Sequence, residues 1–186
     1  VLVITLGAYR WVNSAQHSNT LKIGISPPYA ELLKSVADDV KAQGINVELI
    51  EFSDWQAPNV AVQNGDIDAN FFQQSVFLAN AIQQTGYDLH AFAAGSGSHV
   101  GLYSKKYTRF GDLPESAKVV IPNDPVNQGR ALQLLQQAKL ITLKNPENYL
   151  SSLKDIAVNP KKLQFTPNVE ASLLPQMYNN DEGAAV

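Results

Sequence analysis

From residue 20 onward, short apolar runs alternate with longer stretches in which apolar residues recur at helical spacing. Strand-like and helix-like segments that take turns along a chain are typical of an α/β fold. Glycine or proline stands at most of the changes of pattern and marks where elements end. The predicted strands are 21–25, 47–52, 66–71, 89–94, 101–104, 119–122 and 163–165, and the predicted helices are 31–43, 58–64, 74–84, 127–139, 148–157 and 173–179.

The elements fall into two α/β series, joined by a polar crossing that begins near residue 105. A chain of 186 residues is long enough for one domain or for two small lobes. We therefore expect residues 20–105 to form the N-terminal part of a first lobe and residues 106–186 to form a second lobe. The final residues, 183–186, have the pattern of a buried strand that starts to return to the first lobe.

The first 19 residues differ from the rest of the chain. An apolar run over 1–8 is followed by a small, polar stretch over 13–19, and the run is too short to span a bilayer. This order matches the end of a secretory signal sequence, with Ser14 and Ala15 near a processing point, and it predicts export. A leader that carries no signal is the alternative interpretation.

Composition removes several classes of function. The chain has 14 Lys and Arg against 17 Asp and Glu, a net charge of -3, and no basic block, so we expect no nucleic-acid partner. It has no cysteine, which excludes disulfides, thiolate metal sites, a thiol nucleophile and a lipid-modified cysteine. The three histidines lack metal-site spacing, and no phosphate-binding loop or nucleophile elbow occurs, so we predict no metal and no cofactor. A Ser, His and Asp triad stays open, because its members need only meet in space.

The stretch PNDPVNQGR over 122–130 lies between a predicted strand and the first turn of a predicted helix. Such a position favours anions, because unpaired backbone N–H groups and the helix dipole point toward it. Arg130 in this turn has the fork geometry that binds a carboxylate through two parallel hydrogen bonds. Asn127 would add an amide donor or acceptor. An ordinary capped helix with a surface arginine remains the alternative.

Aromatic residues gather where the predicted strands of the first series end. Ligands in open α/β sheets bind at such strand ends. Phe52 and Phe71 are predicted to be core. Trp55, Phe72 and Phe77 are candidates for the wall of an apolar pocket, and Phe72 is followed by polar neighbours.

Four stretches resemble the NlpA/MetQ family, the methionine-type substrate-binding proteins of bacterial ABC importers. They are EFSDWQAPN (51–59), GDIDANFFQ (65–73), YSKK (103–106) and PNDPVNQGR (122–130), and the resemblance runs from residue 21 to residue 186. It implies a two-lobe type-II periplasmic binding-protein fold that holds its ligand in the cleft and closes about a hinge. Family chains continue past the residues that match 184–186. The second half of the first lobe is therefore expected to be missing here, and its sheet is expected to have an open edge.

The resemblance also implies the site. In the family, the arginine that matches Arg130 binds the amino-acid carboxylate, with the residue that matches Asn127 beside it. The family's side-chain pocket falls on Trp55, Phe72, Gln74 and Phe77. Methionine binders usually have Tyr, His and Tyr where this chain has Trp55, Gln74 and Phe77, so the pocket differs in polarity and shape.

We therefore predict a periplasmic substrate-binding protein, not an enzyme, that binds methionine or a related small apolar amino acid. Its partners would be the permease and the ATPase of an ABC importer. Because the chain lacks the cysteine that anchors many family members, it would be free in the periplasm or tethered by its N-terminal segment. Two alternatives remain: an incomplete or domain-swapped homologue that binds no ligand, and an α/β hydrolase-type enzyme.

Overall fold

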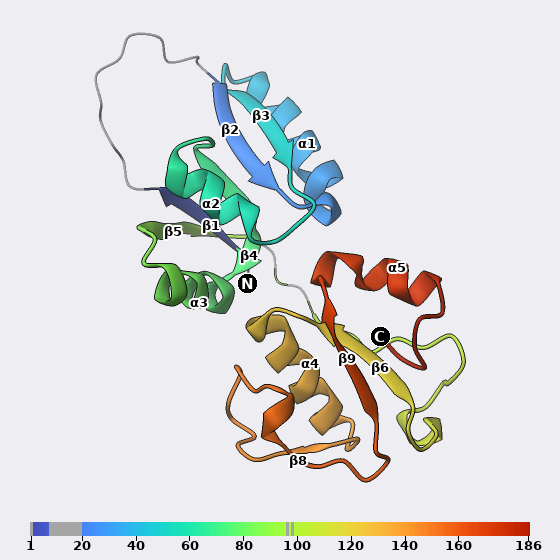
Figure 1. Cartoon of the computed structure of the whole chain (residues 1–186). Helices are drawn as coiled ribbons and strands as arrows, with labels where there is room; N and C mark the ends of the chain where they lie inside the picture. Colours follow the sequence, from blue (N-terminus) through green and yellow to red (C-terminus); the bar gives the residue numbers. More distant parts are fainter. Residues whose placement is uncertain (1, 8–19, 96, 98) are drawn as a thin grey trace. The chain divides into compact units, whose positions relative to one another are not determined.

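The computed structural model describes residues 2–7, 20–95, 97 and 99–186. The chain divides into two compact units, Val1–Ser98 and His99–Val186 (Figure 1). Each unit combines β-strands with helices, so the predicted α/β class is confirmed. The division falls before residue 99, whereas the predicted lobe boundary was between residues 105 and 106.

Unit 1 is built on a five-stranded sheet with the strand order β3-β2-β4-β1-β5 (Figure 1). Strands β2, β3 and β4 run parallel, and β1 runs antiparallel to both of its neighbours, β4 and β5. The strands are β1 (Leu2–Gly7), β2 (Thr20–Ile25), β3 (Asn46–Glu51), β4 (Ala69–Gln74) and β5 (Leu89–Ala94), and the helices are a 3-10 turn (Pro27–Tyr29), α1 (Ala30–Lys41), α2 (Ala57–Asn64) and α3 (Ser75–Thr85).

Strand β1 lies inside the sheet, in the part of the chain where we expected a leader. It pairs with β4 from Leu2 opposite Gln74 to Leu6 opposite Ala69, and it pairs with β5 on its other side. An extended segment in this position satisfies the backbone N–H and C=O groups that β4 and β5 would otherwise leave unpaired. The expected open edge is therefore not found at this position of the sheet. The predicted processing point at Ser14 and Ala15 lies outside the described residues.

A cleaved leader and an inner strand are incompatible roles for residues 2–7 in one mature molecule. Processing near Ala15 would remove β1 and separate β4 from β5. The structure thus gives the N-terminal segment a role in the sheet that its apolar composition alone did not predict.

Two glycines end helices of unit 1 as the sequence predicted. Gly65 follows α2 and Gly86 follows α3, with φ angles of 79° and 73°, which are in the left-handed region that glycine adopts without a steric penalty. After Gly65, strand β4 begins three residues later than predicted. Immediately before β4, the Asp68 carboxylate accepts from the Lys22 N–H at 2.8 Å. The small core beneath α2 and α3 contains Ala61, Val62, Ile67, Leu78 and Leu89.

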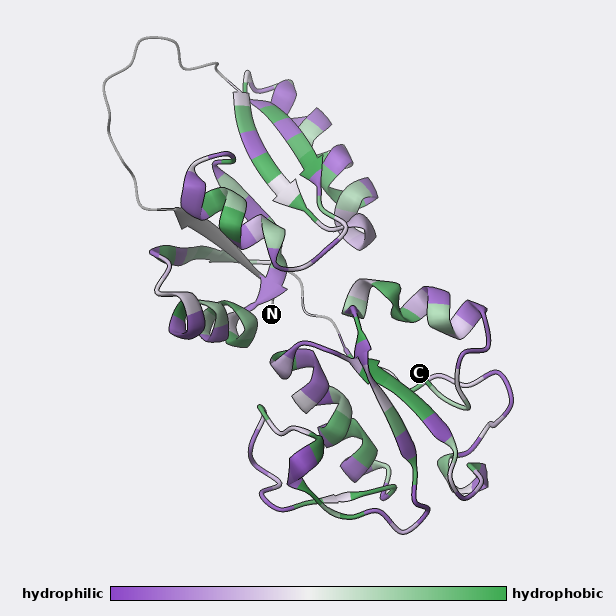
Figure 2. Cartoon of the chain, viewed as in Figure 1, coloured by the Kyte–Doolittle hydropathy of each residue, from purple (hydrophilic) through white to green (hydrophobic). Residues whose placement is uncertain are grey.

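Unit 2 contains two small sheets. Strands β6 (Lys118–Pro122) and β9 (Gln164–Val169) pair in parallel, and Ala185 adds a single parallel bridge to Val119. Figure 2 shows β6 as hydrophobic over most of its length, in keeping with its burial. The remaining elements are α4 (Pro125–Gln137), β7 (Thr142–Leu143), β8 (Ile156–Val158), α5 (Leu174–Asn179) and three 3-10 turns (Phe110–Asp112, Leu153–Asp155 and Ala171–Leu173).

Two predictions in unit 2 are wrong. Residues 101–104 form no strand, although Tyr103 and Val186 exchange two backbone hydrogen bonds of 2.9 Å. Residues 148–157 form no α-helix, because the Asp155 carboxylate accepts from both the N–H and the hydroxyl of Ser152 and closes a short turn. The residues that follow this turn then pair with β7 as strand β8.

Deletion of residues 1–7 tests the place of β1. We expect the backbone amides of β4 and β5 to exchange with deuterium faster, because both strands lose a partner, while the amides of unit 2 keep their protection. Mass-resolved hydrogen exchange measures both units in the same molecule, so unit 2 is an internal control. Unchanged protection of β4 and β5 would mean that β1 contributes nothing to the sheet.

Candidate functional site

The start of α4 carries an acidic cap. Asp124 is buried, and its carboxylate accepts from the Asn127 backbone N–H at 2.8 Å. The helix begins at Pro125, two residues before the predicted start, which places Arg130 in the second turn. A carboxylate of the chain itself therefore occupies the helix N-terminus, where a bound anion was expected.

Asn127 links this cap to Arg130. Its side-chain N–H donates to both Asp124 carboxylate oxygens, at 3.0 and 3.1 Å, and its side-chain oxygen accepts from Arg130 Nη1 at 3.4 Å. Asn127 is buried and Arg130 is half-buried. The amide of Asn127 is thus fixed by the Asp124 carboxylate and turns its oxygen toward the arginine.

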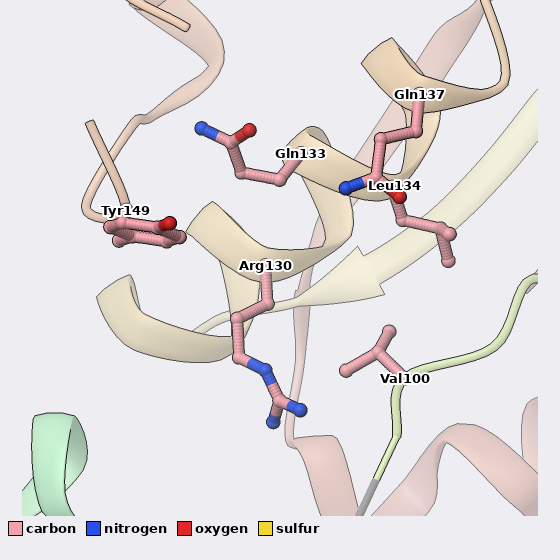
Figure 3. A pocket seen from close by; sticks show the side chains of 6 residues that line it. All are labelled: Val100, Arg130, Gln133, Leu134, Gln137 and Tyr149. Atoms are coloured by element: carbon pink, nitrogen blue, oxygen red, sulfur yellow. The ribbon is translucent and has the colours of Figure 1, made fainter. Parts of the chain in front are cut away.

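Arg130 also lines a surface pocket of about 220 Å³ in unit 2. Figure 3 shows Arg130, Gln133, Leu134 and Gln137 projecting from successive turns of α4, with Tyr149 on a neighbouring loop and Val100 on the segment before β6. Gln133 holds the loop, because its side-chain N–H donates to the Pro146 and Asn148 carbonyls at 2.7 and 3.2 Å.

Gly129 allows that loop to approach α4. A Cβ atom at this position would overlap the carbonyl group of Tyr149. The glycine beside Arg130 is therefore required by close backbone packing rather than by a turn. The sequence showed this glycine within the PNDPVNQGR stretch but gave no reason for it.

In unit 1, Phe72 and Gln74 lie on β4, Phe77 lies on α3, and Trp55 precedes α2. The rings of Phe72 and Phe77 meet edge to face, with centroids 5.8 Å apart, and both residues are buried. Gln74 is half-buried at the last position of β4, directly before α3. Trp55 is half-buried in the turn before α2, and its Nε1 is shielded from solvent and has no hydrogen-bond partner among the described residues.

A buried donor without a partner costs free energy, which makes Trp55 Nε1 a candidate hydrogen-bond donor to a ligand. The structure brings Phe72 into contact with Phe77, and Asn127 into contact with Arg130.

Sequence reasoning missed three features of these sites. Asp124 and Gly129 were read only as parts of a motif. A buried cluster of Asn59, Asn70 and Gln73 was not identified at all, since polar residues in a strand and a helix predict no mutual contact.

We also searched the described residues for metal sites and for membrane-spanning helices. Among the residues that the structure describes, no group of three or more His, Asp or Glu side chains is placed to hold a metal ion. His90 instead lies beside Asp88, with Nε2 and Oδ1 3.1 Å apart. Within the same residues, no helix has the length and apolarity needed to cross a membrane.

The two α/β units define the class of the chain, which is the two-lobe type-II periplasmic binding-protein fold. Solved structures of this class match closely. A nutrient-binding protein from Burkholderia cenocepacia bound to methionine superimposes with a TM-score of 0.83 at 37% identity, over 89% of this chain and 69% of that one. The substrate-binding protein of a methionine transporter from Streptococcus pneumoniae gives a TM-score of 0.84 at 34% identity, over 91% and 68%.

The chain belongs to the NlpA lipoprotein family, whose sequence profile matches residues 21–186. It is 40% identical over 142 residues to the probable D-methionine-binding lipoprotein MetQ of Pasteurella multocida, and 38% identical over 162 residues to D-methionine-binding lipoprotein MetQ of Escherichia coli K12. These alignments cover 76% and 85% of this chain but 51% and 59% of the relatives. The chain thus spans between half and three fifths of their length, and the predicted family is confirmed.

Substitution of Gly129 by alanine tests the close packing of α4. Gly129→Ala should lower the free energy of unfolding by about 1–3 kcal/mol, because the added methyl group must push the Tyr149 backbone away. Urea denaturation measures the effect. Gly111→Ala is the matched control, since a Cβ atom there would meet nothing within 4 Å. Equal stabilities of the two variants would show that the loop accommodates the methyl group without cost.

Proposed function

We propose that this chain is a substrate-binding protein of an ABC importer and that it binds methionine or a related small apolar amino acid. The observation that carries the proposal is Arg130, a half-buried arginine oriented by a buried asparagine, beside a pocket in a member of the NlpA lipoprotein family. The methionine in the Burkholderia cenocepacia relative and the names of the MetQ relatives support the choice of ligand.

Each predicted residue then has a role. Arg130 binds the ligand carboxylate through charge-assisted hydrogen bonds. Asn127 orients the guanidinium, because the Asp124 carboxylate already holds its side-chain N–H. Phe72 and Phe77 provide apolar surface for the ligand side chain, and Gln74 and the Trp55 indole N–H provide polar contacts at its margin. The ligand stabilises the conformation in which these contacts are made together.

The protein carries its ligand and does not transform it. Its partners are the permease and the ATPase of the importer, and it acts in the periplasm. The relatives support this role, because their names describe binding proteins of transport systems rather than enzymes. Turnover of an ester or an amino acid by the purified chain would favour the hydrolase alternative. A ligand-free dimer would favour a domain-swapped homologue.

Arg130→Ala is the direct test of the carboxylate site. Binding of methionine should weaken by at least about 2 kcal/mol, roughly 30-fold in Kd, because the charged pair is left unmade. Isothermal titration calorimetry with both enantiomers of methionine measures it. Arg130→Lys keeps the charge but loses the paired hydrogen bonds, so its affinity should lie between those of the wild type and the alanine variant.

Arg109→Ala is the control for general effects of removing an arginine. The Arg109 side chain is 81% exposed and forms an ion pair with Asp112, so its loss should leave the affinity unchanged. Equal affinities of wild type and Arg130→Ala would place the carboxylate elsewhere and remove the central residue of the proposed site.

A further inference from the structure

Three buried amide side chains connect α2 to β4. Asn59 and Gln73 exchange two hydrogen bonds, from Asn59 Nδ2 to Gln73 Oε1 at 2.9 Å and from Gln73 Nε2 to Asn59 Oδ1 at 2.7 Å. Asn70 Nδ2 donates to the same Asn59 oxygen at 3.0 Å and to the Pro58 carbonyl at 3.1 Å. All three residues are at most 3% exposed, so these bonds form where water does not compete.

A β-bulge makes this cluster possible. Residues three apart in a regular strand point to opposite faces of the sheet, yet Asn70 and Gln73 bond to the same asparagine. Along β1, Val3 lies opposite Gln73 and the next residue, Ile4, lies opposite Phe71. Phe72 is therefore the extra residue of β4. Asn70 and Gln73, three apart on β4, pair with Thr5 and Val3, which are only two apart on β1.

The residue at the bulge is one of the predicted pocket residues. A bulge changes the direction in which a side chain points, and bulges are common next to functional sites. Phe72 is also next in sequence to Gln73. The hydrogen bonds that fix Gln73 to Asn59 consequently fix the backbone from which the Phe72 ring projects onto Phe77.

The cluster is connected to Trp55 through helix α2, which carries Asn59 and follows the Trp55 turn. The Asp54 carboxylate accepts from the backbone N–H groups of Gln56 and Ala57, at 2.9 and 2.8 Å, and so ties the Trp55 turn to the start of α2. Asn59 lies within the first turns of that helix. Since Asn59 holds α2 to β4, we expect the position of the Trp55 indole relative to Phe72 to depend on the hydrogen bonds of this cluster.

We propose that Asn59, Asn70 and Gln73 are positioning residues that set the ligand specificity of the predicted pocket residues of unit 1 by holding α2, and the Trp55 turn that precedes it, to the bulged strand β4. The cluster touches no ligand itself. Apolar residues of the same size would fill the same space, but they would not fix the register between a helix and a bulged strand, because apolar packing has little directional preference. The consequence for ligand binding rests on the proposed function, whereas the consequence for Trp55 does not.

Asn59→Leu removes the central member of the cluster at nearly constant volume. In a Trp11→Phe background, where Trp55 is the remaining tryptophan, we expect its indole N–H resonance to shift and to exchange faster with solvent, without any ligand present. We also expect the Kd for methionine to rise at least about tenfold in the folded protein. Heteronuclear NMR and calorimetry measure the two effects, and circular dichroism establishes the folded fraction.

Gln63→Leu is the matched control. Gln63 lies near the C-terminal end of the same helix, whereas the Trp55 turn precedes its N-terminal end. The Gln63 side-chain oxygen accepts a hydrogen bond from the Asp88 N–H at 2.9 Å. The substitution should lower stability without changing the Trp55 resonance or the affinity. If Asn59→Leu does not fold, Asn59→Ser keeps a hydroxyl donor and acceptor for the same two measurements.

The outcomes separate the two proposals. A folded Asn59 variant with an unchanged Trp55 resonance and unchanged affinity would overturn the positioning role and leave a purely structural cluster. If the wild type binds no methionine, the proposed ligand fails, and the Trp55 resonance still decides whether the cluster positions the turn.

Discussion

The backbone groups of strand β4 and its buried side-chain amides must all form hydrogen bonds. The arrangement of the neighbouring elements of unit 1 depends on how they form them. Strand β4 pairs with β2 on one side and with β1 on the other, and the second pairing contains the bulge at Phe72. That bulge places Asn70 and Gln73 on one face, where Asn59 completes their hydrogen bonds. The N-terminal strand, the helix α2 and the predicted pocket are therefore linked through six residues of one strand.

In unit 2, an arginine lies close to an acidic helix cap. The Asp124 carboxylate is directed to the backbone and the side chain of Asn127, which leaves the oxygen of Asn127 for Arg130. The Asn127 side chain thus bonds to both the acid and the arginine. Gly129 adds the second requirement of this region, since its missing side chain lets the Tyr149 loop lie against the helix.

Local patterns predicted most of the helices and strands, because the spacing of apolar residues and the glycines and prolines that end elements are short-range properties. The ends of α2 and α3 at Gly65 and Gly86 are examples, and so is the family, whose motifs are contiguous. Features that depend on distant partners were not predicted. An apolar run at residues 2–7 fits a leader as well as a strand until β4 and β5 are seen on either side of it. The amide cluster and the turn at Ser152 and Asp155 likewise arise from tertiary contacts and side-chain hydrogen bonds that no periodicity records.

The central claim is that this chain, although shorter than its relatives, binds one small apolar amino acid through Arg130. Native mass spectrometry of the purified chain with an equimolar mixture of free amino acids tests it most directly. The account predicts a monomer whose mass increases by that of one methionine or one related apolar amino acid. The Arg130→Ala variant should show no such increase. A chain that gains no mass from any amino acid, or an Arg130→Ala variant that gains as much as the wild type, would contradict it.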